Sequence, residues 1–284
     1  MISVRLQRLA LDGYYLNFGK ASMGNLLITI RGLKKSYGKG ASRNDVLKGI
    51  DLDINPGQII GYIGPNGAGK STTVKILCGI LPDFEGEISI FGKDLRTQSL
   101  EIKKHIGYVP ETGALYDLLT PNEYLNFIGA LYKIDASVLD SRIENLLSFF
   151  CMEKHADQRM DTFSKGMKQK ILITAGIINN PDILFLDEPL SGLDANSVIL
   201  VKELLISLAK DGKTIFYCSH LMDVVEKISD RIILINNGIV VADGNFDELK
   251  TEKADTLELL FAQLTGRHDN EINTADLFNG IKRN

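Results

Sequence analysis

Near the start of the chain, hydrophobic and polar positions alternate as they do in strands. The runs LLITIRGL and VLKGIDLDI both place apolar residues at nearly every second position. In the second run Ile50, Leu52 and Ile54 would share one face, while the acids between them would share the other. Sheets that keep one polar face are usually antiparallel, so we predict an antiparallel sheet in this part of the chain.

The next segment predicts a buried strand that leads directly into a helix. QIIGYIG is almost continuously apolar, which is typical of a parallel strand covered on both faces. Val74, Leu77, Cys78 and Leu81 then recur at helical spacing. The segment 64–69 is therefore expected to join a strand to a helix.

Later segments divide into a helical part and a part in which strands and helices alternate. Residues from about 97 to 175 carry apolar stripes at helical spacing, as in TPNEYLNFIGALYKI, and are predicted to form an inserted helical subdomain. The alternation resumes with DILFLD, TIFYCSH and RIILI, which predicts an α/β fold. We expect one domain over residues 25–250, an N-terminal extension (1–24) and a C-terminal tail (251–284).

Composition and charge narrow the class of protein. Of the 284 residues 44% are apolar, which suffices for a core of ordinary size. A formal charge of -4 provides no general attraction for nucleic acid or anionic lipid. Three widely spaced cysteines fit reduced thiols better than a disulfide framework. No apolar run reaches the roughly 18 to 20 residues of a membrane span, and the N-terminal segment lacks the apolar core of a signal peptide.

A glycine-rich segment carries the clearest chemical signal. GPNGAGKSTT, residues 64–73, matches G-x-x-x-x-G-K-[ST], whose glycines let backbone N–H groups face a phosphate chain at the positive end of a helix. Lys70 is expected to reach the β- and γ-phosphates, Ser71 to place its hydroxyl on Mg²⁺, and Thr72 to contact phosphate. The residues predicted to bind a nucleoside triphosphate are Gly64, Pro65, Asn66, Gly67, Ala68, Gly69, Lys70, Ser71 and Thr72.

Two acids and a histidine follow later strands. Asp187 and Glu188 end the apolar run in DILFLDEP, and His220 ends TIFYCSH. Ligands of open α/β sheets collect at the carboxyl ends of the strands, so both carboxylates are expected in the same crevice as Lys70. Asp187 would support Mg²⁺ and Glu188 would polarise the attacking water. His220 would either hydrogen-bond the γ-phosphate or hold Glu188 and the water in place.

Together these motifs resemble the nucleotide-binding subunit of an ABC transporter, over about residues 25–250. SGLD at 191–194 resembles the family's D-loop, and SYG around Tyr37 resembles the segment whose aromatic residue stacks on adenine. The resemblance implies a P-loop NTPase fold of the ABC ATPase type, with a RecA-like core, an antiparallel β subdomain and an inserted helical subdomain. It also implies ATP and Mg²⁺ as cofactors and places Tyr37 and Asp194 at the nucleotide.

The family's signature motif, usually LSGGQ, stands here as FSKGM at 163–167. Ser164 and Gly166 are retained, whereas Lys165 and Met167 depart from the pattern. The resemblance implies that Ser164, the backbone amides and a helix N-terminus complete the nucleotide site of the opposite subunit. A dimer of two ATPase subunits, identical or different, with two nucleotides between them is therefore expected.

A second departure lies in VPET, where the family usually has glutamine and this chain has Glu111. Its carboxylate could reach Mg²⁺ or water, so we expect Glu111 to be a catalytic and metal-binding residue. The same carboxylate adds a negative charge near phosphate. The following segment, GALYDLLTPNEYLNF, corresponds to the family surface that receives a helix of the membrane partner. VPE, SKGM and TLELLFAQLTG resemble the ATPase chains of bacterial export-type systems.

The leading hypothesis is an ATPase subunit that hydrolyses ATP as a dimer and drives a separate integral-membrane permease, in the direction of export. It would lie at the cytoplasmic face of the membrane through that permease, with no nucleic-acid partner. The alternative is a soluble ABC ATPase that remodels ribosome or nucleic-acid complexes, although the chain has no second cassette, cysteine cluster or basic stripe. A third possibility, a cassette that binds ATP without hydrolysing it, is disfavoured by Glu188 and His220.

Overall fold

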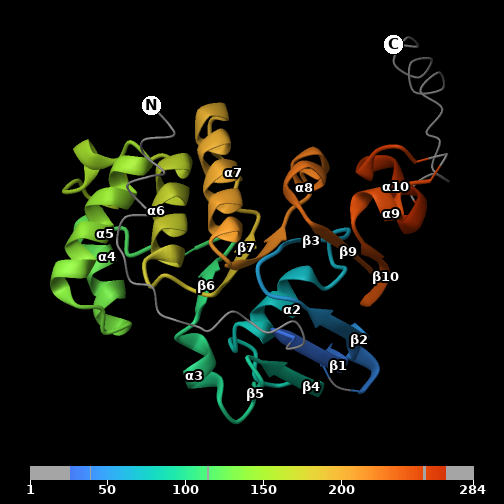
Figure 1. Ribbon diagram of the computed structural model, residues 1–284. Helices are drawn as coiled ribbons and strands as arrows, with labels where there is room; N and C mark the ends of the chain where they lie inside the picture. The colour runs from blue at the N-terminus through green and yellow to red at the C-terminus, as the bar shows by residue number, and fades with distance from the viewer. Residues whose placement is uncertain (1–25, 39, 114, 252–253, 267–284) are drawn as a thin grey trace, which may run out of the picture.

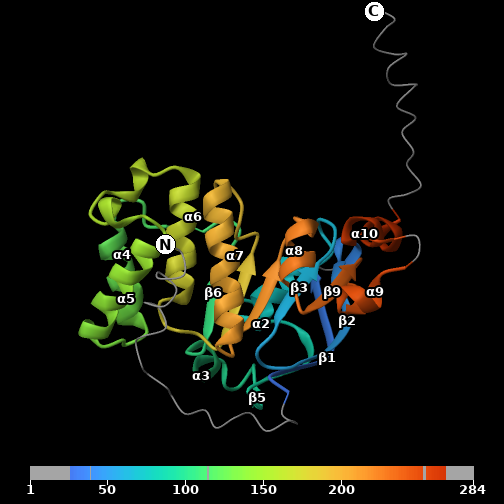
Figure 2. The ribbon, with the colours of Figure 1, turned by 45° about the horizontal axis from the view of Figure 1, so that its top comes forward.

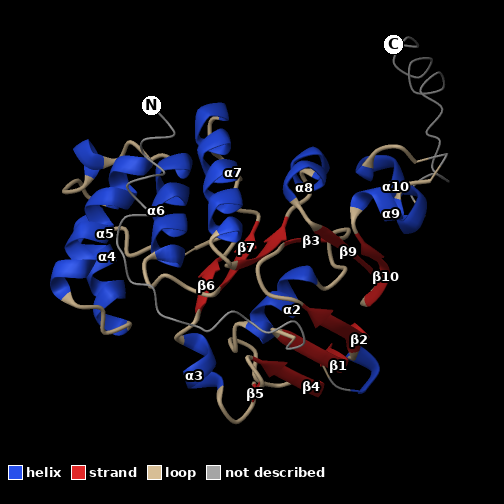
Figure 3. Ribbon diagram, in the orientation of Figure 1, coloured by secondary structure: helices blue, strands red, loops and turns tan. Residues whose placement is uncertain are grey.

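Two sheets and several helices make up the described part of the chain (Figures 1 and 3). The computed structural model describes residues 26–38, 40–113, 115–251 and 254–266; the expected extension at 1–24 and most of the expected tail lie outside them. The larger sheet has the order β10-β9-β3-β8-β7-β6. Its strands are β3 (Ile59–Ile63), β6 (Ile106–Val109), β7 (Ile183–Asp187), β8 (Thr214–Cys218), β9 (Arg231–Asn236) and β10 (Ile239–Gly244).

The central strands of the larger sheet are parallel and buried on both faces. β3 pairs in parallel with β8 and β9, and β7 pairs in parallel with β6 and β8; β10 joins β9 antiparallel at one edge. All five residues of β3, β7 and β8 are buried. Side chains of a strand point alternately to the two faces, so this sheet contributes to two hydrophobic cores. The prediction of buried parallel strands is confirmed.

The smaller sheet packs below the larger one, and a helix lies between them. Its order is β2-β1-β4-β5 and every pairing is antiparallel, as predicted. Its strands are β1 (Ile28–Tyr37), β2 (Asn44–Ile54), β4 (Glu85–Ile90) and β5 (Lys93–Asp94). Helix α2 (Lys70–Leu77) shares one core with β1, β2 and β4 and with Ile60, Tyr62 and Phe216 of the larger sheet (Figure 1).

Helix α3 (Ser99–Lys103) lies on the same side of the larger sheet as α2, where Ile102 joins that core, and the remaining helices cover the opposite face and one end (Figures 1 and 2). These remaining helices are α4 (Pro121–Leu131), α5 (Ala136–Phe149), α6 (Lys165–Ile177), α7 (Ala195–Lys210), α8 (Met222–Ile228), α9 (Phe246–Leu249) and α10 (Leu257–Thr265). Short 3-10 turns lie at Gly40–Ser42, Glu153–His155 and Met160–Thr162. Thr120 begins α4 with a reciprocal capping box to Glu123, followed by Pro121 at the first helical position.

The range expected to be helical, 97–175, also contains the edge strand β6. The run IGYV is too short to show a period in the sequence, and it becomes a strand because Ile106 and Val109 are buried against β7. Helix α6 then packs on β6 at very close range. A Cβ at Gly107 would collide with the Gly176 carbonyl oxygen of α6 and would lie 2.9 Å from Pro181 Cγ.

We expect Gly107→Ala to destabilise the protein, because the added methyl group meets backbone that cannot move without shifting α6 from the sheet. Overpacking of a core costs about 1–3 kcal/mol, so thermal unfolding should occur several degrees lower. Gly244→Ala is the matched control, since its Cβ meets side-chain atoms at 3.1 Å or more. Equal melting temperatures for the two variants would contradict this account of the α6 contact.

Candidate nucleotide-binding and catalytic site

The phosphate-loop segment 64–69 connects the end of β3 to the start of α2 (Figure 1). Gly69 has a φ of 110°, in the left-handed region that favours glycine. A Cβ at Gly69 would lie 2.5 Å from Leu47 Cδ2, and a Cβ at Gly64 would collide with the Ile235 carbonyl oxygen. Backbone geometry and close packing therefore require these glycines. The first N–H groups of α2 have no intrahelical partner and are available to an anion.

Lys70 lies folded back over the same loop. Its Nζ donates to the carbonyl oxygens of Gly64 at 2.7 Å and Pro65 at 3.3 Å. An ammonium group held by two loop carbonyls lies where the positive end of α2 also points. The loop thus concentrates positive charge at one place.

A buried hydroxyl pair supports the loop from beneath. Thr73 Oγ1 donates to the Gly69 carbonyl oxygen at 3.0 Å and accepts from the Tyr62 hydroxyl at 3.2 Å. Burial raises the pKa of Tyr62, so its hydroxyl keeps the proton that it donates. These supporting residues were not predicted from sequence. In the sequence, Tyr62 is one residue of an apolar strand and Thr73 is the residue after Thr72 of the motif, so nothing in the pattern indicated that the two are hydrogen-bonded.

Asp187 ends β7 beside the start of α2. Its side chain is buried, and the side chain of Ser71 lies beside it. Burial raises the pKa of Asp187, the nearby Ser71 hydroxyl opposes that rise, and the negative charge of Glu111 adds to it. Lys70 and Lys75 favour the ionised form. The structure therefore brings together the lysine, the hydroxyl and both carboxylates that were expected at one point.

Glu188 follows directly in a left-handed conformation, with a φ of 49°. Non-glycine residues seldom adopt this region, and they keep it only where surrounding contacts enforce it. Here the Glu188 N–H donates to the Cys218 carbonyl oxygen at 2.9 Å. Glu188 Oε2 accepts from Ser219 Oγ at 3.1 Å, and Oε1 lies 2.8 Å from His220 Nδ1. The carboxylate is therefore oriented by the end of the neighbouring strand, β8.

His220 is placed as the link between Glu188 and solvent. Its side chain is 69% exposed, whereas that of Glu188 is 11% exposed. Sequence reasoning left open whether this histidine meets phosphate or holds Glu188; the 2.8 Å contact shows the second arrangement. Ser219, which was not predicted, holds the other carboxylate oxygen. The only sequence signal for it was its place beside the histidine in TIFYCSH.

The signature segment begins α6 on the side of the 188–194 turn. Ser164 is the N-cap residue, and its hydroxyl accepts from the Met167 N–H at 3.2 Å. Gln169, one turn further on, is buried and donates to the Pro189 carbonyl oxygen at 3.0 Å. Among the described residues, no hydrogen bond joins Ser164 to segment 64–72 of the same chain.

The lysine that departs from the usual signature has a specific contact. Lys165 Nζ donates to Ser191 Oγ at 2.8 Å, and its aliphatic carbons lie against Gly192. A Cβ at Gly166 would lie 2.7 Å from the Gly192 carbonyl oxygen. The segments FSKGM and SGLD therefore pack directly on each other.

Asp194 has a structural role in this chain. It is the N-cap of α7, and its carboxylate accepts from the Ser197 N–H at 3.0 Å and from Ser197 Oγ at 2.5 Å. These bonds, the side-chain bond first, lower the pKa of Asp194. The expected nucleotide contact of Asp194 remains a prediction, because both oxygens face the helix here.

The remaining predicted residues are exposed. Tyr37 ends β1 with 42% of its surface exposed, so one part of its ring is open to a ligand. Glu111 is exposed after β6, close enough to Asp187 for its charge to affect the pKa of that carboxyl.

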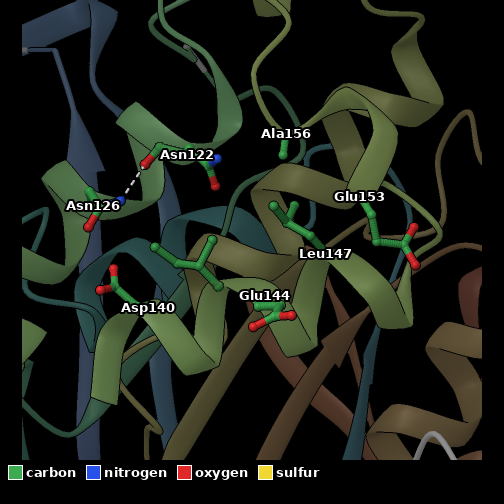
Figure 4. Close-up of a pocket in the computed structure, with 8 residues that line it drawn as sticks. Asn122, Asn126, Asp140, Glu144, Leu147, Glu153 and Ala156 are labelled. Carbon is green, nitrogen blue, oxygen red and sulfur yellow. Dashed lines mark hydrogen bonds between the residues drawn. The ribbon is translucent and has the colours of Figure 1, made fainter. Parts of the chain in front are cut away.

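A separate pocket lies among α4, α5 and the following turn (Figure 4). Its volume is about 330 Å³. Three carboxylates line it, and like charges repel a polyphosphate, so it does not compete with the phosphate loop for nucleotide. The lining residues are Asn122, Asn126, Asp140, Ile143, Glu144, Leu147, Glu153 and Ala156.

Comparison with known proteins identifies the family of this chain. Residues 47–191, just over half of the chain, match the ABC transporter family. The chain belongs to the ABC transporter family. NatA, an ABC transporter ATP-binding protein of Bacillus subtilis, is 36% identical over 218 residues, which cover 76% of this chain and 88% of NatA. The linearmycin resistance ATP-binding protein LnrL of the same species is 35% identical over 223 residues, covering 78% and 70% respectively.

Solved structures of ABC cassettes share the fold. An ATP-binding subunit of an ABC transporter superposes with a TM-score of 0.76 at 30% identity and covers 84% of this chain and 99% of that subunit. A dimeric cassette in a post-hydrolysis state, bound to ADP and Pi, gives a TM-score of 0.72 at 26% identity over 77% of this chain and 98% of its own. This chain is therefore an ATP-binding ABC ATPase with the P-loop NTPase fold. Within the described residues, no helix is long and apolar enough to cross a bilayer.

The capping bond predicts how this ABC ATPase responds to substitution of Asp194. Asp194→Ala removes the acceptor for the first turn of α7 and should lower the melting temperature by a few degrees, whereas Asp194→Asn keeps an N-cap acceptor and should not. Asp211→Ala, at the other end of α7, is the control. If asparagine destabilises as much as alanine, the capping role is wrong. Lost turnover with unchanged stability in Asp194→Asn would instead reveal the nucleotide contact.

Proposed function

We propose that this chain is the motor subunit of an ABC transporter, which closes with a second ATPase subunit on two ATP molecules and drives a separate integral-membrane permease. The observation that carries the proposal is the convergence of Lys70, Ser71, Asp187, Glu188 and His220 at the carboxyl ends of β3, β7 and β8. Phosphoryl transfer needs little from a protein beyond positioning and charge stabilisation, and this set of residues supplies both.

We propose that the phosphates of ATP bind along backbone N–H groups of segment 64–72. Lys70 would exchange its two loop carbonyls for β- and γ-phosphate oxygens, which are stronger partners for an ammonium group. Tyr37 at the rim would stack on the base.

The donor set at Ser71 and Asp187 fits Mg²⁺. A hydroxyl and a carboxylate are the hard oxygen ligands that Mg²⁺ takes, and these two side chains lie close enough for Ser71 to affect the pKa of Asp187. Among the described residues, no group of three or more acidic, histidine or cysteine side chains could hold a metal. That suits an ion that completes its shell with phosphate and water. When bound, Mg²⁺ supplies positive charge to the phosphate oxygens, and Glu111 is the further carboxylate within reach of that charge.

Glu188 is assigned to the attacking water. Its two oxygens are oriented by Ser219 and His220, so the carboxylate can accept a proton from a water molecule without first losing rotational freedom. His220, exposed at the rim, would hold the carboxylate and contact the γ-phosphate through its other nitrogen.

Glu188→Gln should retain ATP binding and lower kcat by about 10²-fold or more, because the amide keeps the size of the side chain but cannot accept the proton. Phosphate release measures turnover, and equilibrium binding of labelled ATP measures affinity. Glu258→Gln, an exposed site on α10, is the matched control. Unchanged turnover in Glu188→Gln would remove Glu188 from the mechanism.

We propose that the signature segment acts on the nucleotide of the other subunit. Two observations support this: Ser164 has no hydrogen bond to segment 64–72 of its own chain, and a similar cassette has been solved as a dimer with ADP and Pi. The N-terminus of α6 would then offer its amides and Ser164 to the partner's γ-phosphate.

Mixing two inactive variants tests this arrangement. In a mixed dimer of Lys70→Ala and Ser164→Arg chains, one site would carry both lesions and the other would be complete if Ser164 acts in trans. We expect one high-affinity ATP per mixed dimer and hydrolysis above that of either variant alone. Two equally weakened sites would show that Ser164 serves its own chain.

An exposed apolar cluster marks the surface proposed for the permease. Tyr116, Leu118, Phe127 and Leu131 are 59%, 70%, 43% and 65% exposed, and the rings of Tyr116 and Phe127 lie 5.7 Å apart. Clusters of this kind on a protein surface usually mark an interaction site. The cluster begins five residues after Glu111 in the chain (116 minus 111), so a docked helix would be linked to that residue by a short segment. Export is the proposed direction, since resistance proteins such as LnrL are among the relatives.

Fractionation of lysed cells tests the proposed function. The native chain should sediment with membranes and, in mild detergent, co-purify with a polytopic membrane protein, as expected for a subunit bound to a permease at the cytoplasmic face. Phe127→Glu should release it from that protein, whereas Lys133→Glu, an exposed residue just beyond α4, should not. Recovery with ribosomes or nucleic acid and no membrane protein would leave the ATPase chemistry intact and replace the transport function with the remodelling one.

A further inference from the structure

A buried lysine lies beside the aromatic residue proposed to stack on the base. Lys35 and Tyr37 are two residues apart on β1, so their side chains point to the same face of the strand. Lys35 is 7% exposed, and Tyr37 is 42% exposed. Lysine is almost never buried to this extent without a partner, so its partners show what it does.

The ammonium group of Lys35 is held by one residue through two acceptors. Its Nζ donates to the Asp83 carbonyl oxygen at 2.5 Å and to Asp83 Oδ2 at 2.9 Å. The Asp83 carboxylate is 96% exposed, so water screens the ion pair and it contributes little to stability. Two bonds to Asp83 fix the position of the ammonium group and leave its third proton for another acceptor.

The other neighbour of the ammonium group is the ring of Tyr37. Lys35 Nζ lies 5.1 Å from the centroid of that ring, within the range of a cation–π interaction. A cation on one face of an aromatic ring keeps that face covered. The ring is still partly exposed, so the remaining surface is available to a base.

Asp83 connects this arrangement to the phosphate loop. Helix α2 begins at Lys70, and the N–H groups of Ile80 and Leu81, just before Asp83, both donate to the Lys75 carbonyl oxygen. Helix α2 and the turn at its C-terminus therefore lie between the residues at the phosphates and the residue that holds Lys35. This part of the chain links the phosphate end of the site to the clamp on Lys35.

We propose that Lys35 is a positioning residue for the nucleobase: clamped by Asp83, its ammonium group holds the Tyr37 ring in the orientation in which the base of ATP stacks on it. This inference rests on the stacking role proposed for Tyr37. The ammonium group of Lys35 contacts Asp83 and the Tyr37 ring, so the proposal assigns it to affinity for the base and not to the hydrolytic step. A lysine that merely filled space would be replaced by methionine at no cost to nucleotide affinity.

Steady-state kinetics distinguish a role in affinity for the base from a role in the hydrolytic step. Lys35→Met keeps most of the length of the side chain and removes the charge, so the KM for ATP should rise about three- to tenfold, as expected for a cation–π interaction of ordinary strength. The kcat at saturating ATP should stay within about twofold, since the residues at the γ-phosphate are untouched. Lys35→Arg, which can also lie over a ring, should restore most of the affinity.

Inhibition by inorganic tripolyphosphate distinguishes a specific loss of base binding from a general structural defect, which would weaken the binding of tripolyphosphate as well. It carries the phosphate chain without the base, so its inhibition constant should be the same in wild type and Lys35→Met. The matched control is Lys34→Met, which removes one charge from the neighbouring exposed position on the opposite face of β1 and should leave both constants unchanged. Equal weakening of tripolyphosphate and ATP in Lys35→Met would overturn the proposal.

A double-substitution cycle distinguishes failure of this inference from failure of the proposed stacking. Tyr37→Ala should raise the KM for ATP, and adding Lys35→Met should raise it no further, because Lys35 acts through the ring. If Tyr37→Ala leaves KM unchanged, the stacking role itself is wrong. If Tyr37→Ala raises KM while Lys35→Met does not, or if the two effects multiply, only the inference about Lys35 is wrong.

Fluorescence gives a direct view of the same contact. The chain has no tryptophan, so Tyr37→Trp introduces a single indole at the proposed stacking position. ATP should quench its emission and tripolyphosphate should not. Adding Lys35→Met should weaken the quenching at saturating ATP, because the indole is no longer held in one orientation. Full quenching in that double variant would contradict the positioning role.

Discussion

The register of three buried parallel strands determines where every residue of the hydrolytic centre lies. β7 pairs with β8 so that Asp187 stands opposite Cys218, and β3 pairs with the other side of β8. The carboxyl ends of the three strands therefore meet at one edge of the sheet, where β3 supplies the phosphate loop. A slip of one residue would move each side chain to the opposite face, so the packing of both cores on this sheet also sets the geometry of the site.

The electrostatic balance at that edge follows from the same packing. Asp187, Glu188 and Glu111 bring several acids close together, and burial raises the pKa of Asp187. Lys70, the N-terminus of α2 and the hydroxyls of Ser71 and Ser219 partly offset this charge. Without a cation, the repulsion between these acids is unfavourable. The arrangement suits a site in which a divalent ion and a polyphosphate bind together and neutralise each other's charge.

The sequence predicted those parts of the site whose residues are close in the chain. The buried strand, glycine turn and helix around Lys70 follow from local pattern, as does the acid pair at the end of β7. Contacts between distant segments were not predictable from one sequence. Ser219 on Glu188, Tyr62 beneath the loop and Asp83 on Lys35 are each joined to their partners only by the folded packing. The strand β6 was hidden in the helical range because four residues show no period, and the capping of α7 by Asp194 was not foreseen because SGLD was interpreted through its resemblance to the D-loop alone.

The central claim is that one edge of the sheet binds ATP and Mg²⁺ between Lys70, Ser71, Asp187 and Glu188. The most direct measurement is a structure of the Glu188→Gln protein crystallised with ATP and Mg²⁺. The account predicts phosphates along segment 64–72, Lys70 Nζ on the β- and γ-phosphates instead of on the loop carbonyls, and the metal between Ser71 and Asp187. Nucleotide bound elsewhere, or Lys70 still held by the carbonyls of Gly64 and Pro65 beneath bound ATP, would contradict it.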